Sequence, residues 1–258
     1  MNDTRPSETT LPKVSVIVPN YNSGDFITEA IQSILDQDYP NLEIIVIDDG
    51  STDGSDKIAE KLGPPIRLIR QKNQGPAAAR NTGIKAATGD YIAFLDADDV
   101  WTPNKLHRQV TLLEDNPDIK VVYGGFEAWP SDKSGHYPPL SSMEFHTSGS
   151  YIDNRLSGWI YHELLLDNHI HIITAIIRPS LVRDIGYFDT ELRTGEDYDF
   201  WLRASRVTPV LKLSDTVALY RTNPNSTTHT PTKINNEKLV LVRAIERFGI
   251  NSPDGATV

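Results

Sequence analysis

The chain contains no cysteine, and it has no long apolar segment. Without cysteine there is no disulfide, no thiolate nucleophile and no cysteine-based zinc site, and such a sequence suits a reducing compartment. No stretch approaches the roughly 18 consecutive apolar residues that a membrane-spanning helix needs. The first dozen residues also lack the apolar centre of a secretory signal. We therefore expect a loose, disordered tail over residues 1–12 and a cytoplasmic protein, with peripheral association at the inner face of the membrane left open.

Positive charge is scarce as well. Lysine and arginine number 25 against 35 aspartates and glutamates, which gives a formal net charge of −10 over 258 residues. A nucleic-acid backbone is bound by clustered basic side chains, so this balance argues against a nucleic-acid partner. It does not exclude a nucleotide ligand, which needs only a local site and a metal ion.

Strand and helix patterns alternate over the first hundred residues. Short β-branched or apolar runs predict strands at residues 14–18, 42–47, 66–69 and 91–95, and periodic segments predict helices at 25–36, 52–62 and 76–87. Such alternation is typical of an α/β fold, a Rossmann-like, mostly parallel sheet with helices on both faces. A further amphipathic helix is predicted at residues 236–248.

Polar residues follow three of these strands. They are Asn20-Tyr21-Asn22, Asp48-Asp49 and the acidic run Asp96 to Asp99, which comes directly after the apolar segment that begins at Tyr91. In open parallel sheets ligands bind beyond the carboxyl ends of the strands. Clustered carboxylates raise one another's pKa unless a cation neutralises them, and hard oxygen ligands suit Mg²⁺ or Mn²⁺. These strand ends therefore predict a ligand site with a divalent metal ion.

Six segments in order resemble the family 2 glycosyltransferases with the GT-A fold. They are Val16-Ile17-Val18-Pro19-Asn20-Tyr21-Asn22, Val46-Ile47-Asp48-Asp49-Gly50-Ser51-Thr52-Asp53, Asn73-Gln74-Gly75-Pro76-Ala77-Ala78-Ala79-Arg80-Asn81, Phe94-Leu95-Asp96-Ala97-Asp98-Asp99, Gly186-Tyr187-Phe188-Asp189 and Glu196-Asp197. The resemblance covers about residues 13 to 226. It implies a nucleotide-sugar-binding half at residues 13–125, an acceptor-binding half at 126–226 and a C-terminal helical tail at 227–258.

The resemblance implies transfer of one sugar from a nucleotide sugar to a hydroxyl group, with inversion at the anomeric carbon. UDP is the usual carrier in the family, with GDP and dTDP left open, and the acceptor is a glycan or lipid-linked glycan in cell-surface polysaccharide synthesis. Carried over by position, Asp197 is the general base, and Asp98 is the ligand of Mn²⁺ or Mg²⁺. The same comparison places the donor on Pro19, Tyr21, one of Asp48 or Asp49, Gly75, Arg80, Asp96 and Asp98.

Three accessory residues are candidates in this comparison. Glu196 orients its neighbour or caps a helix, Trp201 is either core or an acceptor platform, and Asn223 stands where many relatives carry a histidine in a Tyr-Arg-x-His segment. His229, a few residues on, is an alternative to Asn223. His169 and His171 are interpreted as structural or solvated. The Gln-x-x-Arg-Trp motif of processive synthases is absent, so we expect a non-processive enzyme.

Two other functions fit parts of the pattern. A haloacid-dehalogenase-type phosphatase also places Asp-x-Asp after an apolar strand, with the first aspartate as nucleophile, but usually on its first strand, whereas Asp96 follows the fourth. A catalytically weak nucleotide- or glycan-binding module is the other alternative. Asn223 favours it, and the intact Asp98 and Asp197 speak against it.

Overall fold

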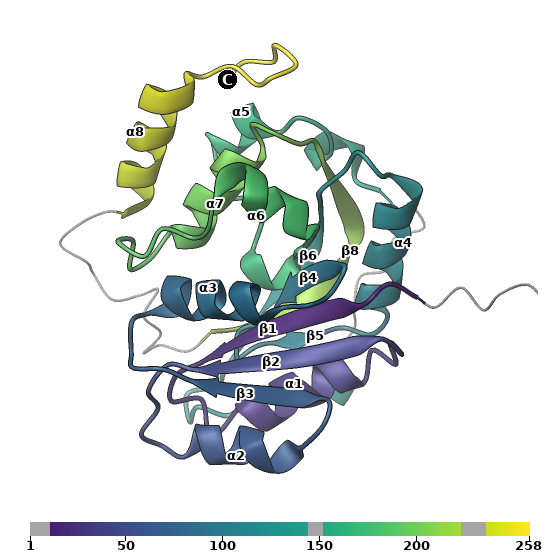
Figure 1. Ribbon diagram of the computed structural model, residues 1–258, viewed down its shortest axis with the longest axis vertical. Coiled ribbons are helices and arrows are strands. Elements are labelled where there is room, and N and C mark those ends of the chain that lie inside the picture. The colour runs from purple at the N-terminus through teal and green to yellow at the C-terminus, as the bar shows by residue number, and fades with distance from the viewer. Residues whose placement is uncertain (1–10, 144–151, 223–235) are drawn as a thin grey trace, which may run out of the picture.

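The computed structural model describes residues 11–143, 152–222 and 236–258. Its first hundred residues form the predicted alternation of strands and helices (Figure 1). The elements are β1 (Val14–Asn20), α1 (Ile27–Leu35), β2 (Leu42–Asp48), α2 (Ser55–Leu62), β3 (Ile66–Arg70), α3 (Pro76–Ala86), β4 (Tyr91–Phe94) and β5 (Val100–Trp101).

One eight-stranded sheet runs through the molecule in the order β3-β2-β1-β4-β7-β6-β8-β5. The first four strands are parallel to one another, and α3 lies on the opposite face of the sheet from α1 and α2 (Figure 1). In the sheet, β2 lies next to β1 and β3 lies beyond β2, whereas β4 lies on the other side of β1. The strand order thus reverses between β1 and β4, which is the switch point at which ligands bind in such sheets.

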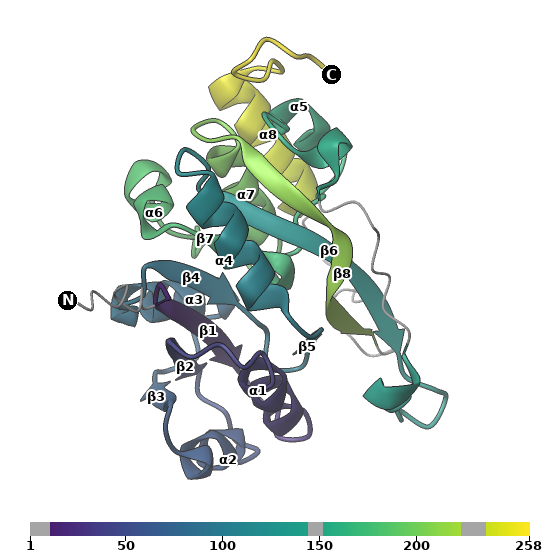
Figure 2. The same cartoon turned by 90° about the vertical axis from the view of Figure 1, so that its right-hand side faces the viewer.

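The rest of the chain completes the sheet and covers its second half. Figure 2 shows the two longest strands, β6 and β8, running side by side. The remaining elements are α4 (Lys105–Asp115), β6 (Val121–Pro130), the 3₁₀ turns η1 (Leu140–Ser142), η2 (Asn154–Leu156) and η3 (Ile172–Thr174), α5 (Tyr161–Leu164), β7 (Ile176–Ile177), α6 (Pro179–Ile185), α7 (Glu196–Ala204), β8 (Val210–Thr222) and α8 (Asn236–Phe248). β7 is antiparallel to both β4 and β6, so the sheet is mixed but mostly parallel.

The central strands are apolar along their length because helices cover both of their faces. Val16, Ile17 and Val18 are fully buried. α3 approaches β1 so closely at Gly83 that an added Cβ atom would lie 2.4 Å from Cγ2 of Ile17. This contact fixes α3, and with it Arg80, against the carboxyl end of β1. None of the helices in the described ranges combines the length and the apolar character that crossing a bilayer requires.

Candidate active site

A cavity of about 540 Å³ opens at the switch point between β1 and β4. The polypeptide after β1, the loop before α3, the acidic loop after β4 and the start of α7 all contribute to it. Its lining residues are Pro19, Asn20, Tyr21, Ser23, Asp49, Asn73, Gly75, Pro76, Ala79, Arg80, Asp96, Ala97, Asp98, His171, Ile172, Arg193, Thr194, Gly195, Glu196, Asp197 and Tyr220. The structure therefore brings most of the residues singled out in the sequence to one place.

Asp49 organises the floor of the cavity below the loop before α3. Its carboxylate accepts hydrogen bonds from Gln71 Nε2 at 2.7 Å, from the Gln74 backbone N–H at 3.0 Å and from the Gly75 backbone N–H at 2.8 Å. Gly75 has a φ of +90°, a conformation that favours glycine, and directly precedes α3. The side chain of Asp49 is thus committed to holding this loop, and only its edge faces the cavity.

Asp48 does not line the cavity, in contrast to its neighbour. It is buried at the end of β2, where it accepts a hydrogen bond from Asn20 Nδ2 at 2.9 Å. Asn20 Nδ2 also contacts the hydroxyl of Ser55 at the start of α2. The sequence left open which of the two aspartates meets the donor, and the structure places Asp49 at the cavity and Asp48 beneath it, because alternate residues of a strand end point in opposite directions.

Arg80 joins two acidic segments across the cavity. The guanidinium donates to Glu196 Oε1 at 2.6 Å and to Asp96 Oδ1 at 2.8 Å, and the arginine side chain is only 4% exposed. Burial raises the pKa of Glu196, although the Arg80 charge opposes this shift. Since Glu196 lies 116 residues after Arg80, this ion pair connects α3 to the start of α7.

Replacing Arg80 by methionine is expected to lower the free energy of unfolding by about 3–5 kcal/mol at pH 7, because it leaves Glu196 buried without its cation. Urea denaturation measures this loss. Without Arg80, folded Glu196 would hold a proton more tightly than unfolded Glu196 does. The stability deficit of the variant should therefore shrink as the pH falls toward 5.

Arg80→Lys is the matched control, since it keeps the charge but not the fork that spans two carboxylates, and it should lie between the methionine variant and the native chain. A loss below about 1 kcal/mol in Arg80→Met would show that this ion pair does not hold α3 and the start of α7 together.

The acidic loop after β4 gives its three aspartates different surroundings. Asp96 is half-buried and bound to Arg80, Asp98 is exposed at the cavity, and Asp99 is fully buried. Asp99 accepts a hydrogen bond from the backbone N–H of Arg221 on β8, and the Arg221 guanidinium donates to the backbone carbonyl of Asp98 at 2.7 Å. Arg221 is itself packed among the rings of Phe26, Trp129 and Tyr137. The backbone at Asp98 is thus held in place while its carboxylate faces the cavity.

Asp98 is suited to a divalent cation that is shared with a ligand. Partial removal from water within the cavity and the neighbouring Asp96 raise the pKa of Asp98 to about 6, and the charges of Arg221 and Arg80 offset this shift only in part. In the described part of the chain no group of three or more His, Asp or Glu side chains is arranged to hold a metal by itself. Mg²⁺ commonly binds through one or two carboxylates together with substrate phosphates. The donor set therefore fits a metal that arrives with a diphosphate.

Asp197 stands at the beginning of α7 and lines the cavity. Gly195 precedes the helix with a φ of +76°, which turns the chain so that the first helical residues face the cavity. One carboxylate oxygen of Asp197 accepts from the Tyr198 backbone N–H at 2.8 Å. Burial raises the pKa of Asp197, with Arg80 acting in the opposite direction. A carboxylate with a raised pKa at a cavity wall is well placed to accept a proton.

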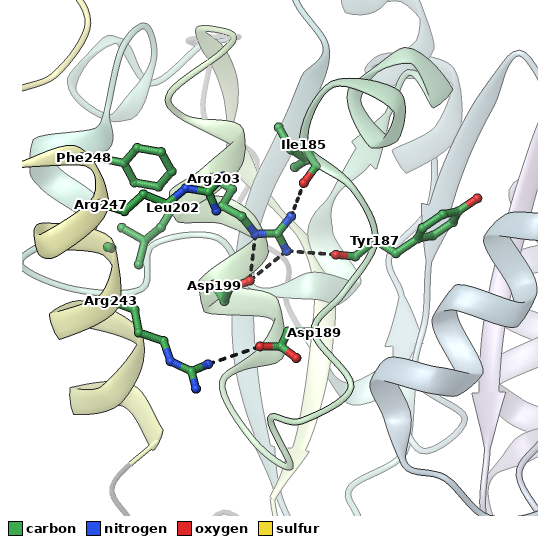
Figure 3. Close-up of a pocket in the computed structure, with 10 residues that line it drawn as sticks. Ile185, Tyr187, Asp189, Asp199, Leu202, Arg203, Arg243, Arg247 and Phe248 are labelled. Atoms are coloured by element: carbon green, nitrogen blue, oxygen red, sulfur yellow. Dashed lines mark hydrogen bonds and ion pairs between the residues drawn. The ribbon is translucent and has the colours of Figure 1, made fainter.

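The opposite face of α7 is fixed by a second set of contacts (Figure 3). Arg203 forms an ion pair with Asp199 at 2.7 Å and donates to the backbone carbonyls of Ile185 and Tyr187. Arg243 on α8 reaches Asp189 at 3.2 Å. These contacts hold α7 between α6 and α8, so that the position of Asp197 does not depend on the cavity loops alone.

Comparison with known proteins agrees with this geometry. A family model described as glycosyl transferase family 2 matches residues 15–165, more than half of the chain. An uncharacterized glycosyltransferase of Rickettsia typhi is 36% identical over 221 residues, which cover 85% of this chain and 67% of that protein. The chain belongs to glycosyl transferase family 2.

Solved structures share the fold of this family 2 chain. The S. aureus TarS fragment in complex with UDP-GlcNAc superposes with a TM-score of 0.69 at 26% sequence identity, covering 90% of this chain and 66% of that one. The mannosyltransferase PcManGT from Pyrobaculum calidifontis, in complex with GDP-Man and Mn²⁺, has a TM-score of 0.64 at 21% identity, and 95% of this chain and 73% of that one are covered. The GT-A fold expected from the sequence is confirmed.

The family 2 chain is shorter than many of its relatives. It spans about two thirds of the R. typhi relative and of the TarS fragment, and 32% of relatives from two other Rickettsia species.

The structure bears on two single residues of this family 2 chain. Of the two alternatives for Trp201, the structure shows the core position, because the side chain is fully buried and packs edge-on against Phe200. His171, interpreted from sequence as structural or solvated, lines the cavity together with Tyr220. Tyr220 could have been found from its place beside Arg221 in the Tyr-Arg segment, whereas nothing in the local pattern separates His171 from His169. Asn223 and His229 lie outside the described residues.

Proposed function

We propose that this chain transfers a single sugar from a nucleotide sugar to an acceptor hydroxyl, by one displacement with inversion at the anomeric carbon. The observation that best supports the proposal is that two carboxylates line one cavity, each on a different element and with different neighbours. Asp98 faces the cavity from the acidic loop, and Asp197 faces it from α7, with Arg80 between the two segments. One carboxylate can then serve the diphosphate while the other serves the acceptor.

In this proposal the donor nucleotide lies over the carboxyl ends of β1 and β2. Tyr21 is 52% exposed beside Pro19, so its ring is available to a base, and the loop held by Asp49 and Gly75 forms the floor. Arg80 and Asp96 stand where the nucleotide meets the diphosphate. UDP is the proposed carrier, since TarS, whose fold this chain shares at 26% identity, was solved with UDP-GlcNAc.

Asp98 is the residue proposed to hold Mn²⁺ or Mg²⁺, and the bound cation would neutralise the negative charge that develops on the departing nucleoside diphosphate. The protein residues supply the rest of the chemistry. Arg80 keeps Asp96 in place below the diphosphate, and Arg221 keeps the Asp98 backbone in place. Asp197 accepts the proton of the acceptor hydroxyl as that oxygen attacks the anomeric carbon from the side opposite the leaving group, which gives inversion.

The acceptor proposed is a glycan or a lipid-linked glycan, used on the cytoplasmic side of the cell in cell-surface polysaccharide synthesis. The donor residues occupy the β1 and β2 side of the cavity. The side formed by η3 and β8, with His171, Ile172 and Tyr220, is left for the acceptor.

Calorimetric titration of UDP, GDP and dTDP, each with Mn²⁺ and again with EDTA, tests the proposal. We expect one nucleotide to bind in a metal-dependent manner, with UDP the favoured one. Absence of binding by all three would overturn the transferase proposal and favour an inert module. Turnover of p-nitrophenyl phosphate that is lost in Asp96→Asn would instead revive the phosphatase alternative, which family membership and the ion pair of Asp96 with Arg80 now oppose.

A further inference from the structure

Three aromatic rings form a continuous surface at the edge of the cavity. Phe126 lies on β6, His171 just before η3 and Tyr220 on β8. The ring centroids of Phe126 and His171 are 4.7 Å apart, and those of His171 and Tyr220 are 4.9 Å apart. His171 and Tyr220 line the cavity, and Phe126 extends the surface outward with 43% of its area exposed.

The pairing of β6 with β8 explains why the rings meet. Phe126 pairs with Ala218, and Ala128 pairs with Tyr220, in the same parallel ladder. Residues two apart on a strand share a face, so the two rings and the two alanines lie on one face of the sheet. The small alanine side chains leave room for the larger rings to spread over the strands, and the rings of Phe126 and Tyr220 meet edge to face at 6.4 Å.

The strand order places this surface away from the nucleotide side. β1 and β2, which carry the proposed nucleotide residues, lie on one side of β4, whereas β7, β6 and β8 lie on the other. The acidic loop that contains Asp98 follows β4 and separates the two regions. A molecule resting on Phe126, His171 and Tyr220 would therefore enter the same cavity as the donor but from the side of β6 and β8, and Asp197 is one of the residues that line this cavity.

The surface is aromatic and uncharged near pH 7. Burial lowers the pKa of His171 to about 4, so its ring is neutral near pH 7. Aromatic ring faces attract aliphatic C–H groups by dispersion and exclude water from them. A pyranose ring has such a C–H face and carries its hydroxyls around the edge, and Asp197 lines the same cavity.

We propose that Phe126, His171 and Tyr220 are the stacking surface for a sugar ring of the acceptor, which makes the acceptor a saccharide instead of an alkyl alcohol or a peptide. The inference rests on the proposed function, because it assigns the second substrate of the same cavity. Phe126 is the exposed outer part of the surface, so its replacement tests the surface with little risk to folding.

Saturation-transfer NMR with methyl β-glucopyranoside, methyl β-galactopyranoside and methyl N-acetyl-β-glucosaminide tests the inference, in the presence of Mg²⁺ and the nucleotide that binds. We expect saturation of the ring C–H protons in the native chain. In Phe126→Ala the Kd of the best sugar should rise about tenfold. Phe126→Tyr should restore the native Kd, and Leu166→Ala, which removes a side chain that is 65% exposed on another surface, should leave it unchanged.

Two outcomes would overturn the inference while leaving the transferase in place. One is that the native chain binds a nucleotide but shows no preference for a sugar ring. It would then bind none of the three sugars, or it would bind glycerol, an open-chain polyol, as tightly as it binds the sugars. The other is that Phe126→Ala binds the sugars as the native chain does. Failure of the proposed function itself would appear separately, as a native chain that binds no nucleotide.

Discussion

Asp197→Asn is expected to lower kcat by about 10²–10⁴-fold and to leave the nucleotide Kd unchanged. The asparagine keeps the shape of the side chain and can still accept the hydrogen bond from the Tyr198 backbone N–H, but it cannot take a proton from the acceptor. Steady-state kinetics with a saturating divalent cation, together with calorimetry of the nucleotide, separates the two effects.

The pH profile gives an independent signature of the same residue. Because burial raises the pKa of Asp197, kcat/KM of the native chain should fall as the pH drops through a value above 3.8, the usual pKa of an aspartate. A saturating cation keeps Asp98 deprotonated during this measurement. The residual activity of Asp197→Asn should lack this decrease.

Asp199→Asn is the matched control for Asp197. It makes the same change two residues further along α7, at a carboxylate that faces Arg203 on the other side of the helix. Asparagine at position 199 can still accept the hydrogen bond from Arg203, so α7 should keep its position and the variant should retain most of the activity. If Asp197→Asn loses nucleotide binding as well as transfer, Asp197 belongs to the donor site and the division of labour between Asp197 and Asp98 is wrong.

Asp98→Ala is expected to abolish the metal dependence of nucleotide binding. In the native chain Mn²⁺ should tighten the binding of the diphosphate. In the variant the Kd measured with Mn²⁺ should equal the Kd measured with EDTA, because the carboxylate proposed to hold the cation against the phosphates is gone. Calorimetric titration measures both values.

The charge change itself needs a control. Asp118→Ala also removes one negative charge, from an exposed position between α4 and β6, and should bind nucleotide as the native chain does. The raised pKa of Asp98, about 6, adds a second expectation. The cation must displace a proton below that pH, so metal-dependent binding should weaken as the pH falls from 7 to 5. Metal-dependent binding that survives in Asp98→Ala would show that another residue holds the cation.

Much of the fold followed from local patterns. The strand from Val14 and the strand from Leu42 were predicted because continuous apolar, β-branched runs of that length are typical of buried parallel strands. The helix predicted at residues 25–36 is α1, Ile27–Leu35, and the helix predicted at 236–248 is α8 with the same ends. These elements were predictable because secondary-structure propensity and hydrophobic periodicity are properties of residues that are adjacent in the sequence.

The candidate site was predictable where it depends on strand ends. Pro19 lies near the end of β1, Tyr21 follows β1, and Asp96 and Asp98 follow β4. Parallel strands have their carboxyl ends at one edge of the sheet, so these residues lie close together. The sequence did not decide between Asp48 and Asp49, because that choice depends on which way each side chain points at the end of β2. Helical spacing also did not decide whether Trp201, one turn after Asp197, is buried in the core or faces the ligand. That depends on how α7 packs, and in the structure Trp201 is buried whereas Asp197 lines the cavity.

The sequence by itself determined the α/β alternation, the acidic loop, the missing cysteine chemistry and the resemblance to the family, since each is a property of contiguous residues. Only the tertiary structure joined Arg80 to Glu196 across 116 residues and assembled Phe126, His171 and Tyr220 into one surface. These residues lie on elements that are far apart in the chain, and their spacing in the sequence does not indicate that they are in contact. The strand order 3-2-1-4-7-6-8-5 brings them together, and that order is fixed by the packing of the whole sheet.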